Sequence, residues 1–399
     1  MAGMSAIKRI GVLTGGGDVP GLNSVIKSVV YRSTEVGQEV LGIRRGWEGL
    51  THLTFEADGT PSADYVRPLD RRSTRAIDRT GGTVLHTSRT NPASMPRDRL
   101  PTGLSEADVA RYATDGGKHD LTPLVLQNLE RLGIDALVAI GGDDTLGYGA
   151  RLGREGFPLV AIPKTMDNDV RGTEYCIGFS TAVTRAKELI NRQRTTLGSH
   201  ERLGVFRIFG RNSGYSAWYA AYVTSARCVI PEVPFELDAL ADVLVEDRRL
   251  NPSGYAFVIA SEGAIWSGGT LEEVGEADAY GHRHKADVGY ALATELRRRT
   301  GIETVNSDLT YDLRSGDPDA LDQMVAITFA NVAMDLLGNG VAGQMVAIRD
   351  GKYGHTALPD ASHGPRHLDV AQLYNAARFR PRYEAKLGAP LLLGGAPQA

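Results

Sequence analysis

The sequence predicts an α/β protein of two domains, each with a largely parallel sheet flanked by helices, and with the active site in the cleft between them. Two apolar runs, residues 136–140 and 158–162, each end abruptly in turn-forming and polar residues, which is typical of buried parallel strands. Further apolar runs alternate with helical patterns along the chain. The length of 399 residues also favours two domains, since one domain has about 150 residues.

Composition narrows the class of protein. The chain is 42% hydrophobic and 23% charged, as is usual for a soluble globular protein. A net charge of −4 gives no general attraction to nucleic acid or membranes, so a phosphorylated ligand needs a local basic cluster. Cys176 and Cys228 are too few for a disulfide framework. Residues 1–10 lack a signal peptide, and no apolar run approaches the roughly 18 residues of a membrane span, so we expect a cytoplasmic protein.

The first element is a strand at residues 10–14, followed by the glycine loop 15–21 and a helix at 22–35. A dinucleotide-binding loop would need glycine where Pro20 stands, and no acidic residue follows a second strand at the expected distance. The chain also lacks the G-x-x-x-x-G-K-[ST] motif and the H-R-D and D-F-G motifs of protein kinases. A dinucleotide-binding site is therefore disfavoured, and a P-loop enzyme and a protein kinase are excluded.

Residues 40–43 form the next expected strand, and a further strand is expected to end in the small polar residues of segment 80–91. Arg89 lies in that segment, where an arginine can grip a phosphate with two parallel hydrogen bonds. Taken alone, the segment favours a structural role for Arg89. Residues 92–122 are rich in Asp, Arg, Pro and Gly and indicate a surface excursion, after which a helix at 122–132 leads to the central strands.

The turn after strand 136–140 has the composition of a phosphate cradle. Gly142 and its neighbouring glycine let the backbone approach a phosphate closely. The residues from Thr145 onwards can open a helix whose N-terminal amides attract anions. Asp143 and Asp144 beside a phosphate need a compensating cation, and Mg²⁺, which prefers oxygen ligands, is the usual one. This turn therefore predicts a site for phosphate and magnesium.

The turn after strand 158–162 supplies Lys164 as a second positive group and Asp167 and Asp169 as a pair of carboxylates. One carboxylate is then free to act as a base on a substrate hydroxyl. In the alternative interpretation the aspartates cap a helix or form a solvated turn, and for either turn alone both interpretations are equally favoured. The carboxyl edge of an α/β sheet is where ligands bind, so the two turns together favour chemistry.

The second half of the chain contains another strand end and helix start that suit an anion. A helix at 182–193 marks the expected start of a second domain, and strand 203–208 leads to a glycine–arginine pair that opens another helix. The strand at 254–260 ends near Glu262, whose carboxylate could accept hydrogen bonds from sugar hydroxyls. The arginine run 297–299 ends a helix, where cations suit the helix dipole, and is interpreted as structural.

Five segments carry a wider resemblance: 9–23, 141–145, 163–169, 210–211 and 311–314. They occur in the order found in the phosphofructokinase family, and the chain most resembles the pyrophosphate-dependent 6-phosphofructokinases, over roughly residues 8–350. The resemblance implies a transferase of glycolysis that moves phosphate reversibly from pyrophosphate to the 1-hydroxyl of fructose 6-phosphate, with Mg²⁺ as cofactor. An ATP-dependent 6-phosphofructokinase is the alternative. A non-catalytic sugar-phosphate sensor is less favoured, because the candidate base Asp167 is present.

The resemblance also assigns roles residue by residue. Catalysis falls to Asp167 as the base and to Lys164, Arg89 and Gly17. Acceptor binding falls to Thr165, Asp169, Arg202, Phe209, Gly210, Arg211, Glu262, Tyr311 and Arg314. Donor-phosphate binding and donor specificity fall to Gly16, Gly17, Gly142, Asp144, Thr145 and Lys164, and metal binding to Asp143. In relatives the match to Arg202 reaches in from a neighbouring subunit, which implies a homodimer or homotetramer.

Two positions bear on the donor. ATP-using short bacterial relatives have glycine at the positions of Asp144 and Lys164, whereas pyrophosphate-using relatives resemble this chain at both. A carboxylate fills the space that a third phosphate would need and repels it. Lysine alone is weaker support, since some ATP-using relatives carry it. Residues 305–310 lack the cation that short bacterial relatives carry in this region, so the resemblance does not extend to one inter-subunit contact with the acceptor phosphate.

The expected domain boundaries follow from these assignments. Residues 1–180 form a phosphate-donor domain to which part of 312–345 returns, and 181–311 form a sugar-phosphate domain with part of 346–388. Residues 389–399 are rich in Gly, Pro and Ala, and we expect them to be a mobile tail. The sequence leaves open dimer or tetramer, allosteric control, and sedoheptulose 7-phosphate as a further acceptor.

Overall fold

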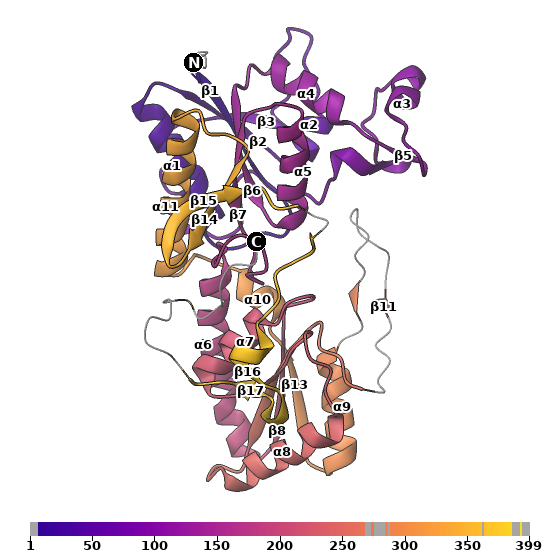
Figure 1. The fold of residues 1–399 in the computed structure, drawn as a ribbon, viewed down its shortest axis with the longest axis vertical. Coiled ribbons are helices and arrows are strands. Elements are labelled where there is room, and N and C mark those ends of the chain that lie inside the picture. The colour runs from indigo at the N-terminus through magenta and orange to yellow at the C-terminus, as the bar shows by residue number, and fades with distance from the viewer. Residues whose placement is uncertain are drawn as a thin grey trace.

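The chain folds around two sheets that lie one above the other along the long axis of the molecule (Figure 1). The computed structural model describes residues 7–267, 273–274, 284–285, 288–360, 363–384 and 392. Helices cover both faces of each sheet (Figure 1). This is the two-domain α/β architecture that the sequence predicts. The expected tail at 389–399 lies outside the described residues except for Leu392.

The larger sheet has seven strands in the order β15-β14-β7-β6-β1-β2-β3. Its five inner strands are parallel, and the edge strands β15 and β3 are antiparallel to their neighbours. The strands are β1 (Arg9–Thr14), β2 (Glu39–Ile43), β3 (Val66–Leu69), β6 (Ala136–Gly141), β7 (Leu159–Pro163), β14 (Gln344–Arg349) and β15 (Lys352–Ala357). Because β6 and β7 are buried on both faces, they read as continuous apolar runs.

Two layers of helices cover this sheet. Apolar side chains of β1 and β6 alternate between two cores, as the two-residue period of a strand requires. On one face lie α1 (Leu22–Glu35) and α11 (Ala320–Gly338). On the other lie α2 (Glu48–Thr51), α4 (Thr122–Arg131) and α5 (Asp143–Arg154). Among the described residues α11 is the one helix long and apolar enough to cross a membrane, but it packs against α1, β7 and β14.

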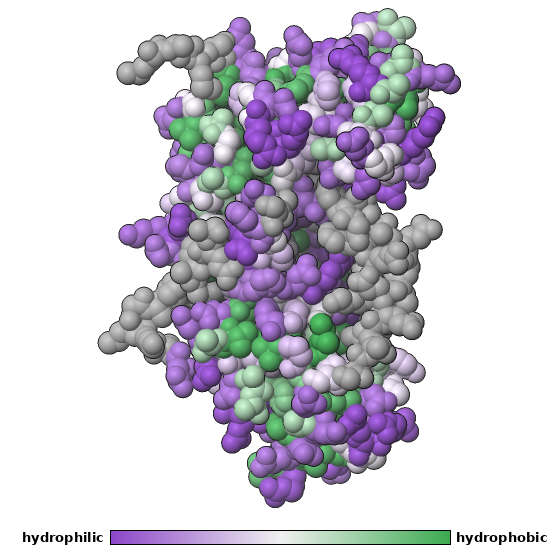
Figure 2. Space-filling model, turned by 45° about the vertical axis from the view of Figure 1, so that its right-hand side comes forward, coloured by the Kyte–Doolittle hydropathy of each residue, from purple (hydrophilic) through white to green (hydrophobic). Residues whose placement is uncertain are grey.

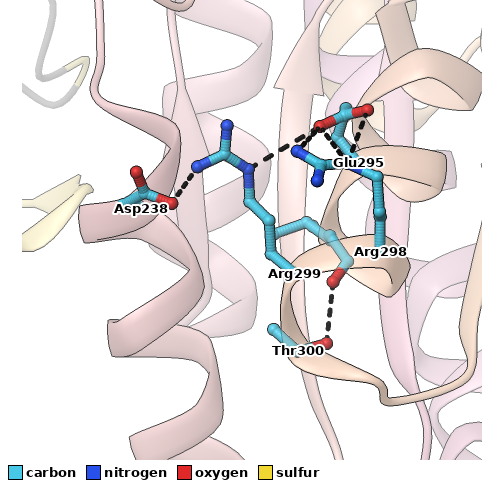
Figure 3. A network of polar contacts seen from close by, with 6 residues as sticks. Asp238, Glu295, Arg298, Arg299 and Thr300 are labelled. Carbon is cyan, nitrogen blue, oxygen red and sulfur yellow. Dashed lines mark hydrogen bonds and ion pairs between the residues drawn. The ribbon is translucent and has the colours of Figure 1, made fainter.

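The smaller sheet is parallel throughout, in the order β13-β8-β10-β9. Its strands are β8 (Leu203–Ile208), β9 (Arg227–Val229), β10 (Ala256–Ser261) and β13 (Thr304–Asp308). One face packs on α6 (Phe179–Ser199) and α7 (Tyr215–Thr224), and the other on α8 (Leu237–Leu250) and α9 (Val288–Thr300). Figure 3 shows Arg299 of α9 reaching Asp238 of α8 and Glu295 one turn back on its own helix. The arginine run thus joins two helices, in agreement with its structural interpretation.

Shorter elements complete the chain. These are the helices α3 (Glu106–Tyr112), α10 (Thr310–Arg314) and α12 (Val370–Leu373), the 3-10 turns Ile77–Arg79, Pro92–Ser94, Arg97–Arg99 and Ala376–Arg378, and the strand pairs β4 (Met95–Pro96) with β5 (Lys118–His119), β11 (Glu273–Val274) with β12 (His284–Lys285), and β16 (Tyr374–Asn375) with β17 (Arg380–Pro381). The surface excursion expected at 92–122 has a small core of its own, formed by Met95, Tyr112 and Leu121.

Two expectations need correction. Residues 80–91 contain no strand; their backbone bonds instead to the loops after β1 and β2, since Ser88 accepts from Gly16 N–H and Leu85 accepts from Arg45 N–H. The chain also stays with the larger sheet through β14 and β15, so its return to that sheet ends at Ala357 rather than at residue 345. Both depend on contacts between distant segments, which local periodicity does not report.

Asp322 of α11 fastens the segment that leads into α6. Its buried carboxylate accepts hydrogen bonds from Tyr175 Oη (2.6 Å), Gly178 N–H (2.8 Å), and the N–H (2.8 Å) and Oγ1 (2.5 Å) of Thr181. Burial raises the pKa of Asp322 to about 6. The segment 175–181 crosses from the larger sheet to the smaller one, so this carboxylate fixes the crossing.

Asp322→Ala should lower the free energy of unfolding by about 3 kcal/mol or more, because buried donors lose their acceptor. Chemical denaturation measures the change. Asp335→Ala on the same helix is the matched control, since Asp335 pairs with Arg32 in an exposed ion pair that should contribute at most about 1 kcal/mol. Equal losses in the two variants would contradict the role given to Asp322.

Candidate active site

The carboxyl ends of the two sheets face a common cleft of about 620 Å³. In Figure 2 hydrophilic residues gather at the waist of the molecule, where the surface is hollowed. The lining comes from loops after β1, β6 and β7 of the larger sheet, from the ends of β8, β10 and β13 of the smaller sheet and the residues after them, and from Pro359, Asp360, Gly364 and Pro365. Carboxyl ends of parallel strands are the usual ligand-binding edge of such sheets.

Two glycine-rich loops and Thr145 form the upper side of the cleft. A Cβ on Gly15 would lie 2.4 Å from Thr145 Oγ1, and one on Gly141 would lie 2.3 Å from Thr145 Cβ. Only glycine therefore allows the loops after β1 and β6 to close around this nearly fully buried threonine. Gly16 has a φ of +78°, which glycine adopts without strain. The result is a backbone surface at the N-terminus of α5 that suits an anion.

Lys164 joins the loop after β7 to the glycine loop after β1. Its side chain is buried, and Nζ donates a 2.5 Å hydrogen bond to the carbonyl of Gly17. Burial lowers the pKa of Lys164 to about 8, against an opposing effect of Asp18. A bound anion would favour the charged form of this lysine.

Three carboxylates meet beside this loop. Burial and, to a smaller extent, the charges of Asp169 and Asp144 together raise the pKa of Asp143 to about 8, with Arg171 opposing. A divalent cation would relieve this concentration of negative charge, and the oxygen donors suit a hard ion such as Mg²⁺. Among the described residues no group of three His, Cys, Asp or Glu side chains could hold a metal ion. The residues fit a magnesium ion held by one or two carboxylates together with substrate phosphates.

The candidate base Asp167 lies in a tightly held turn. Its backbone N–H donates to Thr165 Oγ1 at 3.1 Å. The next residue, Asn168, has a φ of +53° and uses its amide side chain to bond Glu174 O and Cys176 N–H. Asp167 Oδ1 is buried and has no hydrogen-bond partner within the part of the chain that the structure describes. Burial raises the pKa of Asp167 well above its usual range, with Asp169 and Glu262 adding to the effect. An unpartnered carboxylate oxygen can accept a substrate hydroxyl.

A fully buried arginine, Arg366, supports that turn from behind. Its Nη1 donates to the carbonyl of Thr173 at 2.8 Å and its Nη2 to the carbonyl of Asn168 at 3.1 Å. The guanidinium also lies over the ring of Tyr215, 4.4 Å from the ring centroid, and the Arg366 N–H donates to Asp169 O at 2.6 Å. The charge of Arg366 opposes the rise in the pKa of Asp169 that burial causes. Nothing in the local sequence marks this residue.

The lower side of the cleft carries Arg314 and Arg211, two arginines that the sequence assigns to the acceptor. Arg314 packs against the rings of Tyr311 and Phe209, with centroid distances of 4.8 and 5.5 Å, and its Nε lies 3.7 Å from Asp18 Oδ1 across the cleft. Arg211 approaches Glu262 at 3.8 Å. Gly210 has a φ of +129°, and a Cβ there would lie 2.4 Å from Ser261 Oγ, so glycine is needed for the turn that brings Arg211 to the cleft.

The cleft brings together nearly all the residues that the sequence assigns to the site. Those that line it are Gly16, Gly17, Arg89, Gly142, Asp143, Asp144, Thr145, Lys164, Thr165, Asp167, Asp169, Phe209, Arg211, Glu262, Tyr311 and Arg314. Gly210 shapes the turn beside it. Arg202 is the exception, because it precedes β8 at the strand's other end, where its Nε lies 2.9 Å from Glu303.

Sequence reasoning missed several lining residues, among them Asp18, Arg207, Asp308 and Asp360. For Arg207 a signal was present, since it is a lone charged residue within the buried strand 203–208. A buried charge is costly unless it is paired, so its partner could have been sought. Asp18 and Asp360 belong to loops, and Asp308 ends β13; none of the three stands in a diagnostic pattern.

A family model for phosphofructokinase matches residues 9–337. The chain belongs to the phosphofructokinase family. It is 38% identical over 344 residues to the pyrophosphate–fructose 6-phosphate 1-phosphotransferase of Amycolatopsis methanolica, an alignment that covers 86% of this chain and 90% of the relative. It is also 36% identical over 356 residues to the ATP-dependent 6-phosphofructokinase 3 of Streptomyces coelicolor, with coverage of 88% and 94%.

Solved structures agree with the phosphofructokinase fold. The pyrophosphate-dependent phosphofructokinase of Nitrosospira multiformis superposes with a TM-score of 0.73 at 16% identity and covers 94% of this chain and 89% of its own. The corresponding enzyme of Marinobacter aquaeolei gives 0.71 at 16% identity and 98% coverage of both chains. At such identity the likeness concerns the fold alone.

Arg366→Met should loosen the turn at 165–176, because the buried carbonyls of Asn168 and Thr173 lose their donor. Amide hydrogen exchange followed by mass spectrometry should show exchange roughly tenfold faster in that segment, with no change in β6. Arg298→Met, which alters an exposed ion pair, serves as the control. Unchanged protection of 165–176 in the Arg366 variant would contradict the anchoring role.

Proposed function

We propose that this chain transfers a phosphoryl group from pyrophosphate to the 1-hydroxyl of fructose 6-phosphate, giving fructose 1,6-bisphosphate and phosphate. Membership of the phosphofructokinase family and 38% identity to the Amycolatopsis methanolica enzyme support the reaction type. The observation that carries the proposal is the cleft itself, which opposes a glycine and lysine cradle to Arg211 and Arg314, with the buried carboxylate of Asp167 between them. Such a site suits two phosphorylated substrates whose reacting atoms meet in the middle.

Asp167 is the proposed base. Its buried and unpartnered Oδ1 accepts the proton of the acceptor's 1-hydroxyl while the hydroxyl oxygen forms a bond to the terminal phosphorus of the donor. The bridging P–O bond breaks and phosphate leaves. Arg211 and Arg314 oppose the rise in the pKa of Asp167, so these cations favour the ionised form that a base requires.

The rest of the proposed catalysis is positioning and charge neutralisation, as phosphoryl transfer generally requires. Lys164, Arg89 and the amides of the glycine loops hold the donor, and Arg211, Glu262 and Arg314 hold the acceptor. Asp143 would hold Mg²⁺, which when bound supplies positive charge to the donor phosphates. Thr165 and Asp169 keep the turn that carries the base in place beside the donor.

The donor proposal depends on Asp144 and Lys164. Asp144 belongs to the first turn of α5 and lines the cleft, where a carboxylate repels an additional phosphate at low effective dielectric. Lys164 is close enough to the glycine loop to grip a compact diphosphate. ATP is the alternative donor, because ATP-dependent 6-phosphofructokinases of Streptomyces coelicolor and Corynebacterium efficiens are 35–36% identical to this chain.

Arg202 supports a proposed homodimer or homotetramer. In this chain it is held by Glu303 at the amino end of β8, away from the cleft of its own subunit. We propose that it contributes to the acceptor site of a neighbouring subunit, as the resemblance to the family implies.

Asp167→Asn should lower kcat by roughly 10²-fold or more, because the amide cannot take the hydroxyl proton. Fructose 6-phosphate binding should change far less, since the variant keeps the size of the side chain. Steady-state kinetics together with direct titration of the sugar phosphate separate the two effects. A folded Asp167→Asn protein with near-wild-type turnover would remove Asp167 from the role of base.

The wild type should show a higher kcat/KM with pyrophosphate than with ATP in side-by-side coupled assays. Asp144→Gly should raise kcat/KM for ATP relative to pyrophosphate by roughly tenfold, because specificity maintained by repulsion is lost with the repelling group. Arg299→Met, far from the cleft, is the control for general effects on activity. A wild type that prefers ATP would refute the donor proposal and leave the proposed acceptor chemistry intact.

A further inference from the structure

Four charged side chains form a continuous network on the lower side of the cleft. They come from the carboxyl ends of three adjacent strands and the loop after β8: Arg207 from β8, Arg211 from the loop, Glu262 just after β10, and Asp308 from the end of β13. All four line the cleft. Arg207 and Asp308 have no role among the catalytic and binding residues described above.

Arg207 connects two carboxylates with unequal contacts. Its Nη1 donates a short hydrogen bond to Asp308 Oδ2 (2.6 Å), whereas its Nη2 lies 3.5 Å from Glu262 Oε2. In the parallel register of β8 and β13, Asp308 stands directly opposite Arg207. Asp308 therefore fixes the guanidinium of Arg207. The guanidinium lies near Glu262, but too far away to form a short hydrogen bond with its carboxylate.

Glu262 lies between two arginines. Oε2 faces Arg207 at 3.5 Å and Oε1 faces Arg211 at 3.8 Å. Both separations exceed the 2.7–2.9 Å usual for a charge-assisted hydrogen bond. The carboxylate is thus oriented by charge on both sides while its lone pairs stay available to hydroxyl groups, and it is only 16% exposed.

We propose that Arg207 and Asp308 are positioning residues that set the orientation of Glu262 for recognition of the acceptor sugar's hydroxyls. This inference rests on the proposed function. Asp308 holds Arg207, Arg207 holds one oxygen of Glu262, and Arg211 holds the other. The acceptor then meets a carboxylate whose direction is fixed before binding, which lowers the cost of ordering it in the complex.

A guanidinium is needed for this arrangement. Its planar fork can contact Asp308 and Glu262 at the same time, whereas the ammonium of a lysine is a single point of charge. Arg207→Lys should therefore keep one of the two contacts and give an intermediate effect.

The test compares Arg207→Met, Arg207→Lys and Asp308→Asn with wild type in steady-state kinetics with pyrophosphate and fructose 6-phosphate. Loss of the charge-assisted contacts should raise KM for fructose 6-phosphate roughly tenfold in Arg207→Met and Asp308→Asn. KM for pyrophosphate and kcat should stay within about threefold of wild type. Arg207→Lys should fall between wild type and Arg207→Met.

Asp247→Asn is the matched control, because Asp247 of α8 pairs with Arg227 of β9 at 2.7 Å on the same sheet but away from the cleft. It removes an ion pair of the same kind, so it reports the effect of destabilising the sheet alone. Its kinetic constants should equal those of wild type.

A double-mutant cycle joins Arg207→Met to Glu262→Gln. If Arg207 acts through Glu262, the double variant should raise KM for fructose 6-phosphate little more than Glu262→Gln alone. Additive effects, or Arg207 variants that match Asp247→Asn, would overturn the inference while leaving the proposed function intact. A wild type that neither turns over nor binds fructose 6-phosphate in calorimetric titration would refute the proposed function, and the inference with it.

Discussion

The buried guanidinium of Arg366 holds together segments that are far apart in the sequence. It donates to carbonyls of the turn that follows β7 and packs over Tyr215 at the start of α7. The next two residues continue the connection into the smaller domain, where His367 Nδ1 lies 2.8 Å from the Asn212 carbonyl and Leu368 N–H donates to Glu232. Because the guanidinium donates to the turn after β7 and packs over a ring of α7, the position of this side chain constrains both walls of the cleft.

Burial shifts the pKa values of an acidic and a basic group in the cleft in opposite directions. It raises the pKa of Asp143 to about 8 and lowers that of Lys164 to about 8, since both charged forms lose hydration. Anionic phosphates favour the charged lysine and a cation favours the charged aspartate, so the two kinds of ligand suit the site together. A site with these shifts is suited to phosphate and metal in combination.

The parts of the fold that depend on local periodicity were predictable, and those that depend on distant partners were not. Strand 203–208 was predicted with the bounds that β8 has, and the two aspartate turns lie at one cleft as expected, because buried parallel strands and their ends have a distinctive local pattern. Segment 80–91 instead bonds to loops after β1 and β2. Arg366 contacts residues about 150 to 200 positions away. A polar residue in a polar segment gives no sign of such burial.

The same contacts that fix the passage between domains also fix the reactive turn. Within the described residues the chain crosses between the sheets at the start of α6, between α10 and α11, and after β15. Asp322 lies on α11, just after the second crossing, and its hydrogen bonds hold the first crossing at the start of α6. Arg366 follows β15 and anchors the third crossing to the turn that carries Asp167. A displacement of one sheet relative to the other would therefore move Asp167 relative to Arg314, which stands just before the second crossing. It follows that residues outside the cleft can affect the chemistry by setting the distance between its two sides.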